Sequence, residues 1–425
     1  MLDIQFIREN PDLVKKAAHN KGVPDVVNEL LKVDQTRRNL IQEVEKVRAE
    51  RNKLMEGVFG KPSQEVINKG RELRDRLAQL EPELRTAEET FSSLMLQIPN
   101  IPHESVPVGP DENYNVEIAS WGEKPQFDFE PKDHFYLAQN LNIVDFERGA
   151  KVAGFRGYYL KGDGALLHLA IMNYALKKMV EKDFVPFIPP VILQERPFVN
   201  TAHFPWGKVD VYKTFDDEKE LDERYLAGTA EVPLVSYHMD EVLNEKDLPK
   251  LYAGYSQCYR REIGSYGKDT QGMYRIHEFT KVEQVILCKN DWEESFAWHE
   301  KLRQYAEEML QELGLAYRVM LMCTGDMGEP QVKKYDIETW MPGRKAYGET
   351  MSDSVMGDFQ ARRANIRYRT KDGELKYVHM LNNTALASPR ILIAIMETYQ
   401  QADGSIKVPE VLQSFIGKEI IKVKK

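Results

Sequence analysis

The sequence predicts an α+β protein with an N-terminal antiparallel two-helix coiled-coil arm and a second domain built on a mainly antiparallel sheet flanked by helices. Three observations support this prediction. Apolar residues between positions 26 and 94 recur at alternating steps of three and four, as in coiled-coil helices. A proline-rich stretch then interrupts the periodicity. Later strand candidates are joined by turns or by one long helix, not by regular βαβ units, which favours antiparallel pairing.

The composition is typical of a globular protein with two domains. At 425 residues the chain has room for a large domain and an appendage, because single domains usually hold roughly 100–200 residues. The cysteines Cys258, Cys288 and Cys323 lie far apart without paired spacing, so we expect neither a disulfide framework nor a zinc site. No apolar run reaches the ~18 residues of a membrane span. We therefore expect a cytoplasmic protein with no membrane partner.

The first domain, residues 1–98, is predicted to be the helical arm. Asn10 and Pro11 mark the start of a short helix that Gly22 can end. Heptad-spaced residues then predict long helices at 26–54 and 70–94, and the turn signal at residues 57–62 should fold them into an antiparallel pair. Pro82 lies inside the second helix, so we expect a kink near Gln79.

The charge of the arm points to RNA. The whole chain has a net charge of −9, which argues against a generally basic surface, but residues 46–76 hold nine Lys or Arg against five Asp or Glu. This local excess favours contact with phosphates, although the heptad pattern alone also fits a dimerisation coiled coil. The candidate phosphate contacts are Lys46, Arg48, Lys53, Lys61, Lys69, Arg71 and Arg76.

The second domain, residues 132–425, follows a predicted linker at residues 99–131 that is rich in proline, asparagine and glycine. Helical spacing predicts helices at 166–182 and 292–313. Strands are predicted at 184–192, 257–261, 275–287 and 374–381.

Residues 257–283 form a predicted hairpin whose side chains suit a nucleotide. Arg260 and Glu262 lie on its first arm, and Arg275, Phe279 and Glu283 lie on the return arm. A guanidinium group can bind phosphate, an aromatic ring can cover a purine, and a carboxylate can bind an ammonium group. Taken alone, the block also fits an amphipathic hairpin with solvated charges. Neither a P-loop nor a GxGxxG fingerprint is present, so a nucleotide would bind without them.

Three blocks, in this order, resemble the class II aminoacyl-tRNA synthetases and, within that class, the seryl-tRNA synthetases. Residues 226–234, LAGTAEVPL, are similar to their Thr-x-Glu serine-binding loop. Residues 257–283 resemble motif 2, and residues 381–391, LNNTALASPRI, resemble motif 3 with its terminal arginine. The segment at 166–192 resembles motif 1, which forms the dimer interface in that family. The resemblance spans essentially the whole chain, including the arm and the linker.

This resemblance implies ATP-dependent activation of L-serine to seryl-adenylate and transfer of the seryl group to tRNA(Ser) by a homodimer that uses Mg²⁺, with tRNA(Sec) as a second candidate substrate. It assigns the α-phosphate to Arg260, the adenine amino group to Glu262, the γ-phosphate to Arg275, and the two purine faces to Phe279 and Arg390. The implied catalytic residues are Arg260 and Arg390. The implied ATP site comprises Arg260, Arg261, Glu262, Arg275, Ile276, Phe279, Glu349, Thr350, Met351, Ser352 and Arg390. The implied serine pocket comprises Thr229, Ala230, Glu231, Glu283, Asn382 and Thr384, and the implied Mg²⁺ ligands are Glu349 and Ser352.

The sequence departs from the commonest family pattern at a few positions, and other functions remain open. Glu278 stands where glutamine is usual, and motif 3 has Asn383 and the pair Ser388 and Pro389 where many members have glycine and Val-Gly.

The alternative functions are an adenylating ligase that charges a carrier protein, a class II synthetase for threonine, proline or another amino acid, and a non-enzymatic paralogue that uses the arm for binding.

Overall fold

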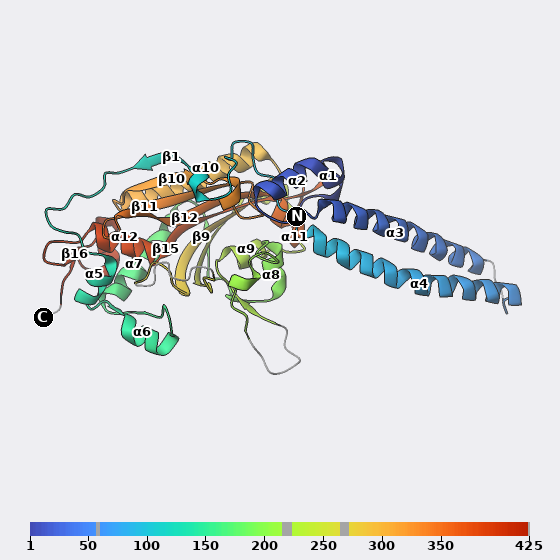
Figure 1. Ribbon diagram of the computed structural model, residues 1–425, viewed down its shortest axis with the longest axis horizontal. Helices are drawn as coiled ribbons and strands as arrows, with labels where there is room; N and C mark the ends of the chain where they lie inside the picture. The colour runs from blue at the N-terminus through green and yellow to red at the C-terminus, as the bar shows by residue number, and fades with distance from the viewer. Residues whose placement is uncertain (57–59, 215–222, 264–271, 424–425) are drawn as a thin grey trace. The chain divides into compact units, whose positions relative to one another are not determined.

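The computed structural model describes residues 1–56, 60–214, 223–263 and 272–423 (Figure 1). The chain divides into two compact units, Met1–Pro99 and Asn100–Lys425. Part of the turn predicted at 57–62 and most of the glycine-containing loop of the predicted hairpin lie outside the described residues. None of the described helices combines the length and the apolar character that a membrane crossing requires.

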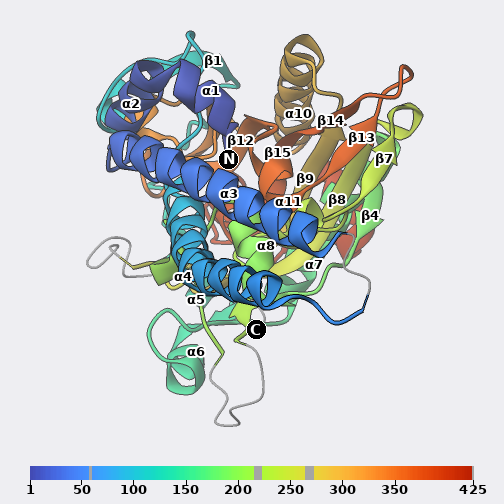
Figure 2. The same ribbon diagram turned by 90° about the vertical axis from the view of Figure 1, so that its right-hand side faces the viewer.

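The first unit consists of four helices: α1 (Ile4–Glu9), α2 (Pro11–Asn20), α3 (Val27–Met55) and α4 (Gln64–Met95). The two long helices run alongside each other (Figures 1 and 2), which confirms the predicted arm. Helix α4 begins at Gln64, earlier than the heptad pattern indicated, because the Ser63 hydroxyl caps it by accepting a hydrogen bond from the Val66 amide at 3.3 Å. Helix α4 continues through Pro82, and the kink near Gln79 stays a prediction. The seam of the arm is formed by Val44, Val47, Leu73, Leu77 and Leu80.

An ion cluster joins α1 to α3. The fully buried carboxylate of Asp34 accepts hydrogen bonds from Arg8 at 2.8 and 3.0 Å and from Arg37 at 3.1 Å. Burial raises the pKa of Asp34, but the arginines outweigh this effect and the net pKa is lowered. Asp34 is therefore a charged anchor for the start of the arm.

The second unit is built on one eight-stranded sheet with the order β1-β10-β11-β12-β15-β9-β8-β4. All neighbouring strands are antiparallel except β4 and β8, so the predicted mainly antiparallel sheet is confirmed. The strands are β1 (Val116–Trp121), β4 (Val185–Phe187), β8 (Lys250–Tyr259), β9 (Glu278–Cys288), β10 (Tyr317–Leu321), β11 (Lys333–Met341), β12 (Ala346–Gly357) and β15 (His379–Ser388).

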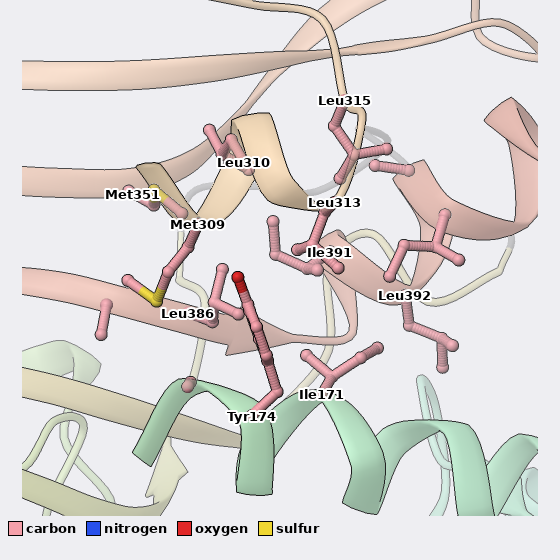
Figure 3. Packing of buried hydrophobic residues seen from close by; sticks show 14 of the residues in the cluster. Ile171, Tyr174, Met309, Leu310, Leu313, Leu315, Met351, Leu386, Ile391 and Leu392 are labelled. Atoms are coloured by element: carbon pink, nitrogen blue, oxygen red, sulfur yellow. The ribbon is translucent and has the colours of Figure 1, made fainter. Parts of the chain in front are cut away.

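Helices α7 (Asp163–Glu181) and α10 (Trp292–Glu312) pack side by side against this sheet. The Tyr174 hydroxyl of α7 donates to Glu312 of α10 at 2.8 Å. Figure 3 shows Tyr174 pointing toward Leu386 of β15 and Met309 of α10. The large core therefore lies between these helices and one face of the sheet, and helix α12 (Arg390–Thr398) extends it.

Shorter elements complete the second unit. Three-stranded and two-stranded sheets group as β14-β13-β7, β16-β17, β2-β3 and β5-β6. The helices are α5 (His134–Asn140), α6 (Phe146–Ala153), α8 (Glu195–Asn200), α9 (Glu231–Val235), α11 (Phe359–Ala364) and α13 (Glu410–Ile416), with 3-10 turns η1 (Glu112–Tyr114), η2 (Lys208–Asp210), η3 (Glu245–Asp247) and η4 (Thr324–Asp326). The strands are β2 (Val144–Asp145), β3 (Tyr159–Leu160), β5 (Ile192–Leu193), β6 (Tyr225–Leu226), β7 (Val242–Asn244), β13 (Arg367–Arg369), β14 (Leu375–Tyr377), β16 (Ile406–Lys407) and β17 (Ile420–Ile421).

Several predicted strands have different bounds in the structure. The strand predicted at 184–192 is divided into β4 and β5, and two prolines between them lack the amide hydrogens that a ladder needs. The strand predicted at 374–381 is likewise divided, with β14 in a separate small sheet and β15 starting at His379. Strand β1 falls within the predicted linker, and most of its side chains are exposed, so it carries no apolar alternation for sequence reasoning to detect.

Candidate active site

A pocket of about 520 Å³ gathers most of the residues proposed from the three sequence blocks. Of the predicted ATP and serine residues, Arg261 and Ala230 do not line it. Arg261 is exposed and donates to the Val209 carbonyl at 3.0 Å, and Ala230 is fully buried in a neighbouring apolar cluster. The lining also includes residues that the sequence reasoning missed, among them His203, Tyr274, Lys281, Gln331 and Lys334.

The pocket lies on the face of the sheet opposite to α10, and strand alternation explains its lining. Glu283 of β9 pairs in register with Thr384 of β15, and both line the pocket. The next residue of β15, Asn383, points the other way and donates to the Leu302 carbonyl of α10 at 2.8 Å. Because side chains alternate between the two faces of a strand, the polar residues of β9, β12 and β15 form one wall.

The predicted hairpin diverges where its functional residues begin. Strand β8 ends at Tyr259 and β9 starts at Glu278, so Arg260 and Arg275 lie beyond the paired strands, contrary to the predicted strand bounds. The Arg260 amide still donates to the His277 carbonyl at 3.0 Å. Glu262 then adopts a positive φ of 53° and forms an ion pair with Arg275. This opening turns the arginine side chains into the pocket instead of alternating them along a strand.

Two buried carboxylates define one end of the pocket. Glu231 and Glu283 are 8% and 2% exposed, and burial raises the pKa of both. Lys281 partly offsets the increase at Glu283, with which it forms an ion pair. The Thr384 hydroxyl lies 3.4 Å from Glu283, and the Thr229 hydroxyl accepts from the Glu231 amide at 3.2 Å. Two carboxylates beside two small hydroxyl groups suit a ligand with an ammonium group and a hydrogen-bonding side chain.

Aromatic rings and guanidinium groups line another part of the pocket. The Arg260 guanidinium lies 5.2 Å from the centre of the Phe279 ring, and its Nε donates to the Gly228 carbonyl at 3.2 Å. The Arg390 guanidinium lies 4.5 Å from the centre of the Tyr274 ring and donates to the Glu349 carbonyl at 2.8 Å. Tyr274 is thus an additional partner of the motif 3 arginine. In the sequence, only its position next to Arg275 could have indicated that Tyr274 belongs to the pocket.

A group of oxygen donors lies near Glu349. Asp336 of β11 pairs in register with Ser352 of β12, is 5% exposed, and has an Oδ1 atom without a hydrogen-bond partner among the described residues. Burial raises the pKa of Asp336, and Lys334 at 3.0 Å opposes this increase. The side chain of Glu349 is 48% exposed; the surrounding protein raises its pKa, but Arg390 and Lys334 outweigh this effect and the net pKa is lowered. Carboxylate and hydroxyl oxygens are the donors that Mg²⁺ accepts, so this group fits the predicted ion.

No cluster of three or more His, Cys, Asp or Glu side chains suited to a metal occurs within the described ranges. A magnesium ion at Glu349 and Ser352 would therefore rely on phosphate and water oxygens for most of its ligands, as Mg²⁺ commonly does. His203, which also lines the pocket, adds no positive charge, because burial and the nearby Arg260 lower its pKa to about 4.

The candidate phosphate contacts of the arm fall into two groups. Arg48, Lys69 and Arg76 form ion pairs within the arm, with Glu81, Glu72 and Glu43 respectively. The other group is exposed and has no ion pair in the part of the chain that the structure describes; it consists of Lys46, Lys53, Lys61 and Arg71. The second group is therefore the more accessible to an RNA backbone.

Comparisons with known proteins agree with this geometry. Residues 1–102 match the family of the seryl-tRNA synthetase N-terminal domain, and residues 212–399 match the tRNA synthetase class II core domain (G, H, P, S and T). The serine–tRNA ligase of Deinococcus radiodurans is 46% identical and is covered, like this chain, over 98% of its length.

Two solved structures are similar over nearly their entire length. The seryl-tRNA synthetase from Pyrococcus horikoshii complexed with ATP gives a TM-score of 0.91 with 40% identity, and all of both chains is covered. The cytoplasmic serine–tRNA ligase from Naegleria fowleri in complex with AMP gives a TM-score of 0.88 with 29% identity, covering 100% of this chain and 99% of that one.

Proposed function

The chain belongs to the seryl-tRNA synthetases, and on that premise we propose that its pocket joins L-serine to ATP and that the enzyme then transfers the seryl group to tRNA(Ser). One observation carries this proposal: Glu231, Glu283 and Thr384 lie in the same pocket as Arg260, Arg390 and Phe279. The first three suit a small hydroxylated amino acid, and the last three suit a nucleotide.

The first reaction needs alignment and charge neutralisation more than it needs a protein nucleophile. A carboxylate oxygen of serine attacks the α-phosphorus of ATP, a new P–O bond forms, and the bond to pyrophosphate breaks. Arg260 is assigned to the α-phosphate, where its fork can stabilise the developing charge. Arg275 is assigned to the γ-phosphate, and Phe279 to the purine ring. Holding both substrates in line accounts for a large part of the rate increase.

Two nearby carboxylates are proposed to bind different groups of serine. Glu231 is assigned to the ammonium group, because no cation forms an ion pair with it among the described residues. Glu283 and Thr384 are assigned to the hydroxyl group of the substrate, since Lys281 already compensates the charge of Glu283. Alanine would leave these buried groups without a hydrogen-bond partner, which disfavours its binding. Asn382 and Thr229 complete the wall of this pocket.

Glu349 and Ser352 are proposed to hold Mg²⁺, with Asp336 close to both. The bound ion would neutralise negative charge on the phosphates of ATP. Glu349 has a second proposed role that does not depend on the ion. Its backbone carbonyl accepts a hydrogen bond from Arg390 at 2.8 Å and so positions that guanidinium group. Thr350 and Met351 lie between the two oxygen donors on β12 and line the same pocket.

Residues 1–98 are proposed to be the tRNA-binding arm, and residues 132–425 the aminoacylation domain. The helical pair with its exposed basic side chains supports the first assignment, and the pocket supports the second. We place the enzyme in the cytoplasm, where its three buried free cysteines would stay reduced.

A homodimer is proposed through the segment around α7, β4 and β5. This segment exposes six apolar side chains, each between 43% and 85% accessible, and many exposed apolar side chains in one segment suit an interaction surface. Sedimentation should give twice the chain mass of 49.2 kDa, and a species of the chain mass alone would contradict the proposal. The six residues are Leu166, Leu169, Val180, Val185, Ile188 and Ile192.

Transfer of labelled serine tests the proposed function. Purified protein, ATP, Mg²⁺ and labelled L-serine should produce acid-precipitable label on tRNA(Ser), released by mild alkali. Label on a carrier protein instead of tRNA would identify the adenylating ligase alternative, and no label on either would reject both. A parallel reaction with tRNA(Sec) determines whether that tRNA is also a substrate.

A further inference from the structure

Gln360 lies outside the serine pocket and contacts Glu231, one of the residues that line it. It lies on α11 (Phe359–Ala364) and is fully buried. Its Nε2 atom donates to Glu231 Oε1 at 2.7 Å and to the Thr201 carbonyl at 3.1 Å. Gln360 does not line the pocket, so it acts on a ligand only through Glu231.

The Thr201 carbonyl fixes which end of the amide faces Glu231. A backbone carbonyl can only accept a hydrogen bond, so the NH₂ group of Gln360 must face it. The same NH₂ group has a second hydrogen, which points to Glu231. In the reverse orientation the amide oxygen would face the Thr201 oxygen and would repel it. The two distances therefore define Gln360 as a donor and Glu231 as an acceptor.

The neighbourhood of Gln360 holds this donor in place. On the same helix, the Arg363 guanidinium donates to the carbonyls of Val199 and Phe204 at 3.1 and 3.0 Å. These bonds attach α11 to the segment that contains Thr201. The Gln360 Oε1 atom is buried without a hydrogen-bond partner in the described part of the chain, which has an energetic cost. The hydrogen bonds of this amide are therefore made by its nitrogen.

Glu231 and Glu283 have partners of different charge: Gln360 is neutral, and Lys281 is a cation. Lys281 is a cation and cancels the charge of Glu283. Gln360 is neutral, so it stabilises the ionised form of Glu231 by hydrogen bonding and leaves the full negative charge for a ligand. A carboxylate needs that free charge to bind an ammonium group strongly.

We propose that Gln360 is a positioning residue that holds Glu231 oriented and ionised, as the acceptor for the ammonium group of the amino acid substrate. The proposal deepens the proposed function and rests on it. Gln360 would thus influence binding of the amino acid although it lies outside the pocket and contacts neither substrate.

The first test replaces Gln360 by methionine, which has a similar length and cannot donate. In ATP–pyrophosphate exchange, Gln360→Met should raise the KM for serine roughly 10- to 100-fold, the range expected for a lost hydrogen bond to a charged group. The KM for ATP should stay within about twofold, because the nucleotide residues are untouched. The midpoint of the acid limb of kcat/KM for serine should move to higher pH, since the ionised Glu231 loses its donor.

Gln400→Met is the matched control. Gln400 is 3% exposed, its Nε2 donates to the carbonyls of Lys132 and Glu397 at 3.0 and 2.8 Å, and its Oε1 accepts from the Lys132 amide at 2.7 Å. The substitution therefore removes three hydrogen bonds of a buried amide. Gln400 does not line the pocket. The control should lower Tm without changing the KM for serine or its pH profile. Equal changes in both variants would show that Gln360 has only a structural role and would overturn the proposal.

Gln360→Glu provides a second variant if the methionine variant does not fold. It keeps the shape of the side chain but places a second carboxyl group beside Glu231, so the two groups should share a proton and the acid limb should again move upward. An unchanged serine profile in a folded variant would refute the inference. Absence of serine-dependent exchange in the unmodified protein would instead refute the proposed function, which keeps the two failures distinct.

Discussion

At the scale of single residues, the pocket contains carboxylates whose pKa values are shifted in opposite directions. Burial raises the pKa of Glu231 and Glu283 above the ordinary 4.5, whereas neighbouring cations produce a net decrease at Glu349. Glu231 and Glu283 should therefore be protonated at higher pH than Glu349, whereas Asp336, whose pKa burial raises to about 6, shares their sensitivity to mild acid.

The pH dependence of serine use follows from these directions. As pH falls, a carboxylate with a raised pKa is protonated earlier, and it then no longer attracts an ammonium group. The acid limb of kcat/KM for serine should have its midpoint above 4.5. Steady-state exchange over a pH series, with fluorescence to exclude unfolding, measures this limb. A midpoint at or below 4.5 in the folded protein would contradict the assignment of the carboxylates.

Arg260 is the residue whose loss should affect the chemical step most. Arg260→Ala should slow formation of the adenylate by a factor on the order of 10² to 10³, as removal of a transition-state charge partner does. Single-turnover release of pyrophosphate measures this rate. Arg318→Ala is the matched control, because Arg318 of β10 lies outside the pocket and pairs with Glu338. A rate for Arg260→Ala close to that of the control would reject the proposed role.

The motifs predicted most of the pocket residues, but only those that the linear pattern reveals. Arg260, Phe279 and Arg390 stand within recognisable blocks, and the structure gathers them in one pocket. Asp336 and Gln360 stand outside those blocks. Asp336 comes close to the site because β11 pairs with β12, and Gln360 does so because α11 packs against α9. Tertiary contacts of this kind leave no signal in local sequence.

At the scale of elements, regular periodicity was the feature that sequence reasoning predicted best. The heptads of α3 and α4 and the helical spacing of α7 and α10 led to helices whose existence the structure confirms. Boundaries were less accurate where tertiary contacts decide them. The arms of the hairpin separate at Tyr259 and Glu278, and the exposed edge strand β1 had no pattern to detect.

The arm should bind RNA mainly through the cations that form no ion pair with any described residue. Lys53→Ala, Lys61→Ala and Arg71→Ala should each weaken tRNA binding and reduce the slope of log K against log salt by roughly 0.7–0.9. Lys69→Ala should have a smaller effect, because Lys69 already forms an ion pair with Glu72 at 2.9 Å. Filter binding at several salt concentrations measures the slopes. Equal slopes for the paired and unpaired positions would contradict this division.

The tip of the arm should be required only for the tRNA step. Deletion of residues 55–64, with a short linker joining α3 to α4, should leave serine-dependent exchange within about twofold and abolish charging of tRNA(Ser), because the pocket lies entirely in the second unit. Exchange and charging are measured on the same preparation. Equal loss of both activities would indicate that the tip serves folding or catalysis and not RNA binding.

At the scale of the whole molecule, we propose that the two compact units carry two separable tasks. The helical unit Met1–Pro99 presents basic side chains, and the unit Asn100–Lys425 contains the pocket. The overall charge of −9 confines RNA attraction to local surfaces, so recognition of the tRNA does not depend on a generally basic protein. Local charge in the sequence predicted this division, whereas the choice of amino acid is proposed to depend on a few side chains in the pocket.

Amino-acid-dependent ATP–pyrophosphate exchange tests the central claim most directly. The purified protein should be assayed with serine, threonine, alanine and proline at equal concentrations, in the absence of tRNA. Exchange should depend on serine, with little or none for alanine, because Glu283 and Thr384 lose their hydroxyl partner. Exchange that depends on one of the other amino acids, or no exchange with any of them, would contradict the assignment of this pocket.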